Sequence, residues 1–548
     1  MRKQVLVSVM ALFSVLLLAC PGGRGESEQA ALRGEGKRLP AAVQSREYRF
    51  PLISDPVTLD PAQLTDSNSA AVARQIHATL VEFDPDGNLR PALAQSWEVS
   101  DDGTTYTFHL VKGAKFHNGR EIKADDVVYS LTRLVDPAVK SPRADLLFPV
   151  VGAKEYFEGK STTKPAVKAL DDYTVEIRLK EPYAPFIDRL AMLNCAIIPR
   201  EEVERLGDQF GNQPVGAGPF KFELWDRDSI LVLERHEGYY RGEPWLRRII
   251  FKIMKDEAAR LQAFKAGELD HTDVPAGQLR AIKEDPKLKK LLVMKPALDM
   301  YAMAFNTEKG IFAQNPKLRL ALNYAVDKEN IVENVLEGAG VVMKGYVPEG
   351  TWYDNPDFEG YPYDPEKAKE LLAEAGYPDG EGLPEITIYL DTQTKHRQIA
   401  EAIHADLSAL GLKVSINTSD WGAFLNRVYS GEFELAQNTW LADYPDPDNY
   451  LYQLLDSHNL GSAGNIGRYQ NPRFDALVRQ AQVELDQEKR AQLYRQAEAI
   501  LAQDAPWLLL FQRKVTLLVQ PWVKGLIVSN MDRAPQLSNT PLEDVRFE

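Results

Sequence analysis

The feature that most constrains the fold is a strand–helix–strand pattern between residues 386 and 417. Ile386 to Leu390 and Lys413 to Asn417 read as short strands, and the helical period of Gln398 to Leu410 lies between them. Such a βαβ unit is a building block of α/β proteins. Because strand-like and helix-like segments alternate through most of the chain, the sequence predicts an α/β fold.

The length of the chain requires more than one core. A single hydrophobic core stops growing near about 250–300 residues, so 548 residues predict two or three lobes. Hydrophobic residues at 44% and charged residues at 26% are typical of a soluble globular protein. The formal net charge of −15 argues against a nucleic-acid partner, because phosphate binding needs a basic surface.

The first 20 residues are predicted to be a targeting segment outside the fold. Arg2 and Lys3 precede an apolar run that is too short for a comfortable membrane span. The run ends in LLAC, which resembles the lipobox of bacterial lipoproteins and makes Cys20 the expected site of lipidation and membrane attachment. The alternative is an anchor helix with an incidental cysteine. Residues 21–45 lack an apolar period and are predicted to be a flexible tether.

After Cys20 the chain contains a single further cysteine, Cys195. One thiol cannot form an intramolecular disulfide, and nothing in the sequence pairs it with a catalytic histidine. We therefore expect Cys195 to be buried and inert.

Several local patterns predict individual elements. Alternating runs on both sides of Asp101-Asp102-Gly103 predict a hairpin. Pro316 to Glu337 is predicted to be one long amphipathic helix, and Pro365 to Ala375 a helix capped by Asp364. Trp507–Phe511 and Lys514–Val519 are predicted to be two strands.

The segment from Asn438 to Tyr450, NTWLADYPDPDNY, is predicted to be a stiff, irregular loop. Pro445 and Pro447 fix their own φ angles and bias the preceding residues away from helix. A rigid loop that carries Trp440, Asp443 and Tyr444 can hold one cation against an apolar wall. Read alone, the segment is better interpreted as a surface turn with acidic decoration.

Four blocks of the chain, in order, resemble the family 5 extracellular solute-binding proteins of ABC importers. They are YTFHLVKGAKFHNGREIKADDVVYSLTRL from Tyr106, PVGAGPF from Pro214, AFNTEKGIFAQNPKLRLALNYAVDKENIV from Ala304 and YDPEKAKELLAEAGY from Tyr363. The family comprises peptide and nickel receptors, and this chain is most similar to its oligopeptide-binding branch. The resemblance covers essentially all of the chain after about Tyr48.

The resemblance implies a two-lobed periplasmic-binding-protein-like (type II) fold with a hinge and an extra inserted domain. Its lobe I would comprise residues 46–80, 183–296 and 511–548. The inserted domain II would comprise residues 81–182, and lobe III residues 297–510. Several short crossings between lobes would share the dihedral changes of hinge closure.

The resemblance also implies where a ligand binds. Asp443 matches the aspartate that pairs with the α-ammonium group of a peptide, a group mostly protonated at pH 7. The backbone of Thr439, Trp440 and Leu441 matches a strand that pairs with the peptide main chain. Such pairing does not depend on the peptide's side chains and suits a receptor of broad sequence tolerance. The aromatic side chains of Trp440 and Trp421 match positions that line pockets, and Tyr301 lies near another. For each aromatic residue, a place in the core is an equal alternative.

The carboxylate end of the ligand is less well matched. His396 matches a histidine of the branch, but Gln437 and Val428 stand where the branch has arginines. Arg427 is adjacent to Val428, yet a shift of one residue turns a helical side chain by roughly 100°. Both His396 and Arg427 therefore remain candidates for which an ordinary surface role is the stronger reading.

Parts of the sequence are compatible with two other functions. Asp443, Asp446 and Asp448 could act as acid/base carboxylates in a hydrolase, but no nucleophile elbow or zinc-spaced cluster accompanies them. Asp446 and Asp448 are better read as loop carboxylates. A receptor of the same fold for a nickel chelate, an oligosaccharide or another solute is the second alternative.

The sequence thus predicts a non-enzymatic, lipid-anchored receptor that binds short peptides at the extracytoplasmic face of a membrane. Its expected partners are a peptide and an ABC permease with its ATPase. We expect a monomer without cofactor or metal.

Overall fold

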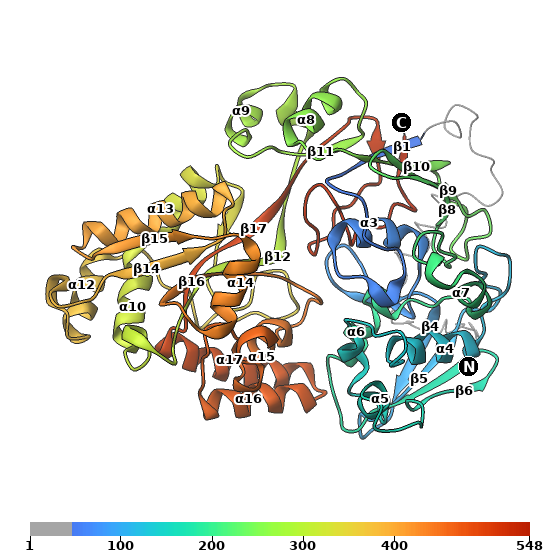
Figure 1. Cartoon of the computed structure of the whole chain (residues 1–548), viewed down its shortest axis with the longest axis horizontal. Helices are drawn as coiled ribbons and strands as arrows, with labels where there is room; N and C mark the ends of the chain where they lie inside the picture. The colour runs from blue at the N-terminus through green and yellow to red at the C-terminus, as the bar shows by residue number, and fades with distance from the viewer. Residues whose placement is uncertain (1–46, 548) are drawn as a thin grey trace, which may run out of the picture.

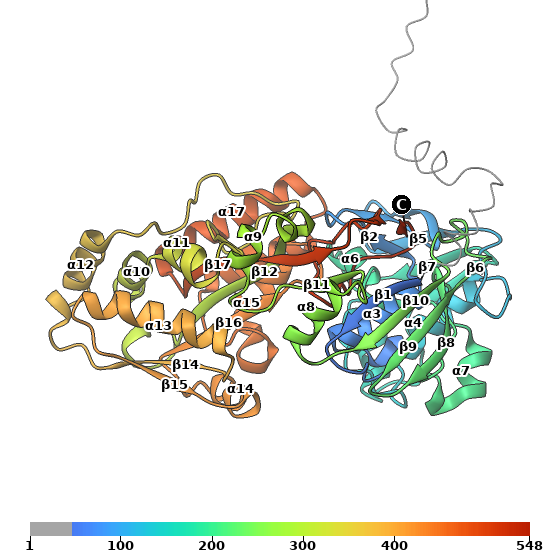
Figure 2. The same ribbon diagram turned by 90° about the horizontal axis from the view of Figure 1, so that it is seen from above.

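The computed structural model describes residues 47–547. These residues form two bodies that lie side by side along the longest axis of the molecule (Figure 1). The C-terminal body contains the elements from β12 to β17, and the N-terminal body contains the preceding elements and the chain after β17. Two long strands, β12 (Leu292–Phe305) and β17 (Trp507–Val519), run between the bodies, as the view from above also shows (Figure 2). The predicted targeting segment with Cys20, and the tether, lie outside the described residues.

The N-terminal body is built from both ends of the described chain. Strand β1 (Glu47–Leu52) lies parallel to β10 (Arg248–Ile253), and β9 (Ile230–Arg235) and β8 (Phe220–Asp226) continue the sheet in antiparallel order. Tyr48 and Phe50 enter a core that also contains Leu542 and Phe547 from the end of the chain. The same body also contains α3 (Ser67–Ile76), α7 (Arg200–Leu206), α8 (Glu257–Lys265), α9 (Leu279–Glu284), β18 (Val523–Lys524) and β19 (Arg546–Phe547). Its short strand β11 (His271–Asp273) pairs with the end of β17 and so joins the sheet of the other body.

A second sheet in the N-terminal body has its own core. Its antiparallel order is β4 (Ala94–Val99), β5 (Thr105–Leu110), β7 (Thr174–Arg178) and β6 (Val167–Asp171), so the hairpin predicted around Asp101-Asp102-Gly103 is confirmed. Smaller elements nearby are β2 (Val81–Phe83), β3 (Leu89–Pro91), α4 (Ala124–Leu134), α5 (Ala153–Phe157) and α6 (Phe186–Leu190).

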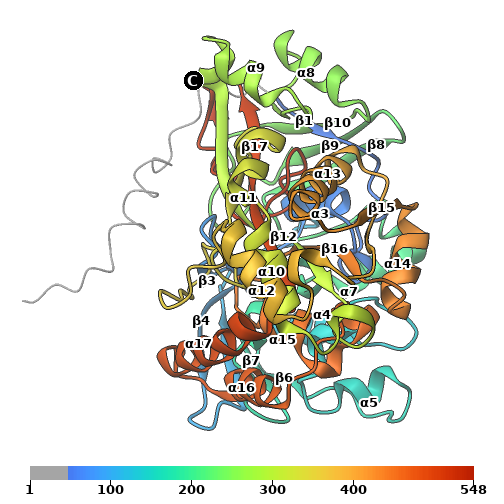
Figure 3. The ribbon, with the colours of Figure 1, turned by 90° about the vertical axis from the view of Figure 1, so that its left-hand side faces the viewer.

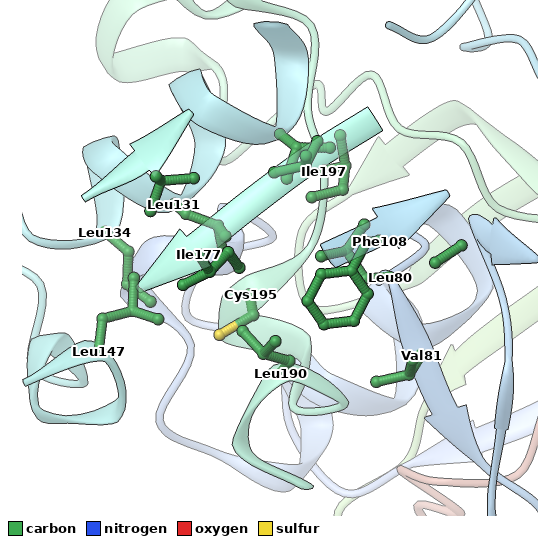
Figure 4. Close-up of a cluster of buried hydrophobic side chains, with 14 of the residues drawn as sticks. Leu80, Val81, Phe108, Leu131, Leu134, Leu147, Ile177, Leu190, Cys195 and Ile197 are labelled. Carbon is green, nitrogen blue, oxygen red and sulfur yellow. The ribbon is translucent and has the colours of Figure 1, made fainter. Parts of the chain in front are cut away.

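Cys195 lies inside this second core. It is 2% exposed and packs with Phe108, Ile177 and Leu190 (Figure 4). Burial raises the pKa of its thiol to about 12, so almost no thiolate forms at neutral pH. The prediction of a buried, inert cysteine is confirmed.

The C-terminal body is organised around a mixed sheet in the order β11–β17–β12–β16–β14–β15, with β13 (Gly340–Val342) beside β17. β14 (Ile386–Leu390), α13 (Thr394–Ala409) and β15 (Val414–Thr418) confirm the predicted βαβ unit, and the two strands pair in parallel. β16 (Leu435–Leu441) lies antiparallel to β12 and parallel to β14.

Helices cover both faces of this sheet (Figures 1 and 3). Tyr301, Met303 and Phe305 of β12 pack against α10 (Pro316–Ala325), α12 (Pro365–Glu374) and α13. The alternate residues of β12, such as Met300 and Ala302, pack against α15 (Asp448–Leu455), α16 (Pro472–Val483) and α17 (Gln487–Asp504). A strand that is covered on both faces is buried there, which explains the apolar run from Met300 to Phe305.

Three predicted elements are corrected. The helix predicted over Pro316–Glu337 breaks at Val326, where Asp327 caps a new turn and accepts from the N–H of Asn330. The two strands predicted between residues 507 and 519 are one strand, β17. The predicted loop at 438–450 is irregular only from Ala442 to Pro447, between the end of β16 and the start of α15 (Asp448–Leu455).

A cleft between the two bodies

Two cavities lie where the bodies face each other. The larger, called the β16 cavity, has a volume of about 420 Å³ and is lined by Arg143 and Asp145 from the N-terminal body and by α14 (Trp421–Ser430), β16 and residues 462–466 from the C-terminal body. The smaller, called the α3 cavity, has a volume of about 240 Å³ and lies between the start of α3 and residues Leu441–Asp443. Arg143 and Asp443 line both cavities, so they stand between the two halves of one interlobe cleft.

One edge of β16 is unpaired where it meets the larger cavity. β14 pairs only with Leu435 and Ala436 of β16. The N–H of Ala442 donates to the oxygen of Leu298, which places the even-numbered residues of β16 toward β12. Because main-chain groups alternate sides along an antiparallel strand, the peptide groups of Gln437, Thr439 and Leu441 point to the unpaired side. An extended ligand could add there as a further strand.

Asp443 stands at the end of this free edge. Its carboxylate is one-third exposed, and its Oδ2 lies 3.1 Å from Nη2 of Arg143 across the cleft. The Oδ1 of Asn449 accepts from the backbone N–H of Asp443 at 3.0 Å and from Nε1 of Trp440 at 2.9 Å. Asn449 therefore fixes the turn, and Asp443 keeps an oxygen for a second cation.

Arg143 has a second carboxylate on its own side of the cleft, because Asp145 lies 3.6 Å from its Nε. Burial lowers the pKa of Arg143, but Asp443 and Asp145 outweigh that effect and raise it. A ligand ammonium group that takes Asp443 would leave Arg143 paired with Asp145. Sequence reasoning missed Arg143, since its partner lies 300 residues along the chain and no local pattern links them.

The other two aspartates of this segment are buried structural groups. Asp446 lies in the irregular segment, as its reading as a loop carboxylate expects, and Asp448 is the first residue of α15. Asp446 accepts from both terminal nitrogens of Arg490 at 2.9 and 3.0 Å. Asp448 accepts from the hydroxyl of Tyr444 and from Nε2 of Gln482, both at 2.8 Å. Burial and the charge of Asp446 raise the pKa of Asp448. Neither carboxylate faces the cavities, and neither is placed for acid/base chemistry on a ligand there.

The predicted aromatic residues divide between the cleft and the core. Trp440 and Trp421 line the β16 cavity, and Trp421 is 53% exposed with its ring stacked on Phe424 at 5.6 Å. Tyr301 is buried behind the sheet, stacked on Phe511 at 5.0 Å, and burial raises the pKa of its hydroxyl. Tyr301 takes no part in lining either cavity.

The residues predicted for the carboxylate end lie away from the two cavities. His396 is buried at the start of α13, where its Nδ1 donates to Asp391 at 2.8 Å. Burial lowers the pKa of His396, and its neutral ring then keeps only a lone pair on Nε2, which cannot donate to a carboxylate. Arg427 lies over the ring of Tyr389 at 4.8 Å and donates to the oxygen of Glu432.

The comparisons with known proteins agree with this two-bodied arrangement. The family model for bacterial extracellular solute-binding proteins, family 5 (middle), matches residues 88–462. The chain belongs to this family.

Two curated relatives and one solved structure illustrate the similarity. The chain is 34% identical to heme-binding protein A of Haemophilus influenzae, over 95% of this chain and 96% of that protein. It is 31% identical to the dipeptide-binding protein of Escherichia coli, over 90% and 94% of the two chains. The murein tripeptide-binding protein MppA, in its unliganded open form, matches with a TM-score of 0.79 at 27% identity, over 92% and 98%.

Family membership confirms the predicted two-lobed binding-protein fold and makes the chain an extracellular solute-binding protein. No group of three histidine, cysteine or carboxylate side chains within residues 47–547 could hold a metal ion. In the same part of the chain, no helix is both long and apolar enough to span a membrane.

Proposed function

We propose that this protein captures short peptides in the interlobe cleft and delivers them to the permease of an ABC importer. The observation that carries the proposal is the free edge of β16 at Gln437–Leu441, which opens on a cavity and ends at Asp443. Main-chain pairing along the edge accepts many peptide sequences, and Asp443 accepts the α-ammonium group. Relatives named for dipeptide and murein tripeptide binding support this choice of ligand.

We also propose that the receptor acts without catalysis, as a monomer held to a membrane through lipidated Cys20. In this proposal, residues 46–80, 183–296 and 511–548 move as lobe I, residues 81–182 as the inserted domain, and residues 297–510 as lobe III. The two crossing strands support a hinge near residues 297 and 511. Radiolabelled palmitate incorporation into the full chain, compared with Cys20→Ala, tests the anchor.

Native mass spectrometry of residues 46–548 tests the ligand class. Incubation with a mixed-sequence pool of di- to tetrapeptides is expected to add peptide masses to the protein. Hemin, a nickel chelate and an oligosaccharide are offered in parallel, since one relative is named for heme binding. Binding of one of these, and of no peptide, would overturn the peptide assignment and leave the fold unaffected.

A further inference from the structure

A group of exposed cations covers α9 and the turn that follows it. Between Leu279 and Leu291 the chain has five cations and two carboxylates, although the whole chain has a net charge of −15. α9 buries Leu279 and Ile282, and a 3-10 turn over Leu288–Leu291 follows it. The exposed cations here, called the basic face, are Lys265 at the end of α8 and Arg280, Lys287, Lys289 and Lys290.

The basic face is not paired with carboxylates of the described chain. Within residues 47–547 none of its five side chains forms an ion pair or a hydrogen bond. Exposed cations of other helices do form such pairs. Arg200 of α7 lies 2.6 Å from an oxygen of Glu204. Lys369 of α12 lies 2.8 Å from an oxygen of Glu366. The charge of the basic face is therefore open to a partner outside the chain.

The carboxylates of this segment offset only part of that charge. The carboxylate of Asp285 accepts from the main-chain N–H groups of Lys287 at 2.7 Å and Leu288 at 3.1 Å. These hydrogen bonds, and then the charges of Lys287 and Lys265, lower the pKa of Asp285, so Lys265 of α8 lies near this turn. With the second carboxylate counted, the segment still has three more cations than carboxylates.

Exposed apolar surface adjoins the basic face at the start of β12. Val293 is 38% exposed, and Leu291 and Leu292 before it are half-buried. Cations beside a few exposed apolar side chains are typical of surfaces that rest in the headgroup region of a membrane. None of these residues, and none of the basic face, lines the β16 cavity or the α3 cavity. A partner bound here therefore occupies neither cavity.

The described chain begins at the same end of the molecule. Arg49, two residues after Glu47, donates from its main-chain N–H and its Nε to Asp270, which connects α8 to β11. α8, α9 and the start of β1 accordingly lie at one end in Figures 1 and 3. Twenty-six residues separate Cys20 from Glu47, and such a length reaches at most about 90 Å. A lipid on Cys20 would keep this end of the molecule within that distance of a membrane.

An anionic membrane surface attracts the basic face more than the net charge of the whole protein repels it. Charges more than about 10 Å apart are largely screened at about 0.1 M salt, so only charges on the contacting face count. Each lysine or arginine close to an anionic surface raises the affinity about fivefold, so three net charges give on the order of 100-fold. A tether to the same membrane adds to this by raising the local concentration.

We propose that the basic face lies on the anionic phospholipid headgroups of the membrane that carries the anchor, and so sets the orientation of the receptor there. The inference rests on the proposed anchor at Cys20 and is independent of which ligand the cleft binds. α8 and α9 project from one long side of the molecule, beside the crossing strands (Figure 1). With this side toward the lipid, the two bodies lie next to each other along the membrane surface.

The test uses residues 21–548 with an N-terminal histidine tag, bound to vesicles that contain nickel-chelating lipid, so the tag replaces the acyl anchor. The measurement is the rate at which an acetylating reagent modifies each lysine, read by mass spectrometry. On phosphatidylcholine vesicles with about 30% phosphatidylglycerol, the lysines of the basic face are expected to react severalfold more slowly than on pure phosphatidylcholine. A salt concentration of about 1 M, at which the screening length is about 3 Å, should remove this protection. The internal controls are three lysines exposed elsewhere, Lys164, Lys168 and Lys489.

Two combined variants test the role of charge. The first reverses three charges of the basic face: Lys287→Glu, Lys289→Glu and Lys290→Glu. Because three cations become three anions, the protection of Lys265 is expected to be lost completely. The matched control makes the same change of charge elsewhere: Lys164→Glu, Lys168→Glu and Lys489→Glu. It should keep the protection, and the unfolding temperature should be unchanged in both, since all six side chains are exposed.

The outcomes separate this surface from the proposed function. Equal acetylation on anionic and neutral vesicles, or protection of Lys265 that survives the first variant, would overturn the proposal and leave the basic face to solvent or to an acidic protein partner. A failure of the anchor is seen separately, as absent palmitate on Cys20, because the tag needs no acyl chain. A failure of peptide binding is seen in the native mass spectra and does not alter the acetylation rates.

Discussion

Individual side-chain contacts determine which aspartate of the 438–450 segment is available to a ligand. Asp446 is paired with Arg490, and Asp448 accepts hydrogen bonds from Tyr444 and Gln482. Asp443 has one ion-pair partner, Arg143, across the cleft. The three aspartates are alike in sequence and differ only in what the fold places beside them. Their roles follow from their partners and not from their spacing.

Asp443→Asn is expected to weaken the binding of free peptides about tenfold or more, because an amide cannot neutralise an ammonium group. N-acetylated versions of the same peptides should lose less than twofold. Calorimetric titration of both peptide forms with wild type and variant measures the difference. An equal loss for both forms would remove the ammonium role from Asp443.

Lys328 is expected to make stability depend on pH above neutrality. Its Nζ donates to the oxygen of Tyr361 at 2.8 Å, yet burial lowers its pKa to about 7. In the unfolded chain a lysine has a pKa of about 10.4. Between pH 7 and about pH 10.4 the unfolded chain therefore binds more protons than the folded protein, and the free energy of unfolding rises with pH.

Lys328→Met should abolish this rise in the free energy of unfolding. In the wild type the rise is expected to be a few kcal/mol, since each unit of pKa difference contributes about 1.4 kcal/mol. Urea unfolding at pH 7 and pH 10 measures it for wild type and variant. The exposed Lys413→Met serves as control and should follow the wild type. A Lys328→Met variant with the wild-type pH slope would show that Lys328 stays protonated in the fold.

The strand β16 supplies a row of main-chain hydrogen-bonding groups. β14 pairs with β16 only at Leu435 and Ala436, whereas β12 pairs with it as far as Leu441, so one edge of β16 is free beyond Ala436. Trp421 of α14 and Trp440 of β16 both line the cavity beside this free edge, so a peptide added there would contact aromatic side chains.

Thr439→Pro is expected to weaken all peptides about tenfold, whatever their end groups, because it removes an N–H that points to the free edge. The β12 ladder should survive, since proline is tolerated where the N–H faces away from the partner strand. Asn438→Pro is the matched control, because its N–H faces β12, and it should lower the unfolding temperature much more. Calorimetry gives the affinities, and thermal unfolding gives the stabilities. Unchanged affinities in a folded Thr439→Pro protein would argue against strand addition.

The βαβ unit at 386–418, the DDG hairpin and the two-lobed family fold could be predicted from sequence, since each rests on local period, turn residues or ordered motifs. The break at Val326 could not, because it depends on Asp327 and on the carbonyl groups that surround Lys328. The pairs Arg143–Asp443 and Asp299–Arg513 join residues more than 200 positions apart, and only the fold brings them together.

The molecule as a whole is two bodies joined by a pair of hydrogen-bonded strands. β12 and β17 pair from end to end except for register shifts after Pro296 and Tyr301. Bending of the two strands at these shifts costs little free energy, because the hydrogen bonds between β12 and β17 are already interrupted there.

Peptide binding is expected to compact the molecule in solution. Small-angle X-ray scattering of residues 46–548 should show the radius of gyration falling toward about 23 Å, the value for a compact chain of this length. Asp443→Asn, at the same peptide concentration, should keep the larger radius. A radius that is unchanged by saturating peptide would contradict closure by a ligand.

Because Cys195 is buried and its thiol stays protonated, the folded protein is expected to react very little with thiol reagents. Residues 46–548 contain no other cysteine, and this one sits beneath Phe108 and Leu190 with its proton held tightly. A pair of cysteines introduced on opposite walls of the cleft would therefore take spin labels or fluorophores alone. The distance between the two walls could then be followed, ligand by ligand, without first removing a native sulfur.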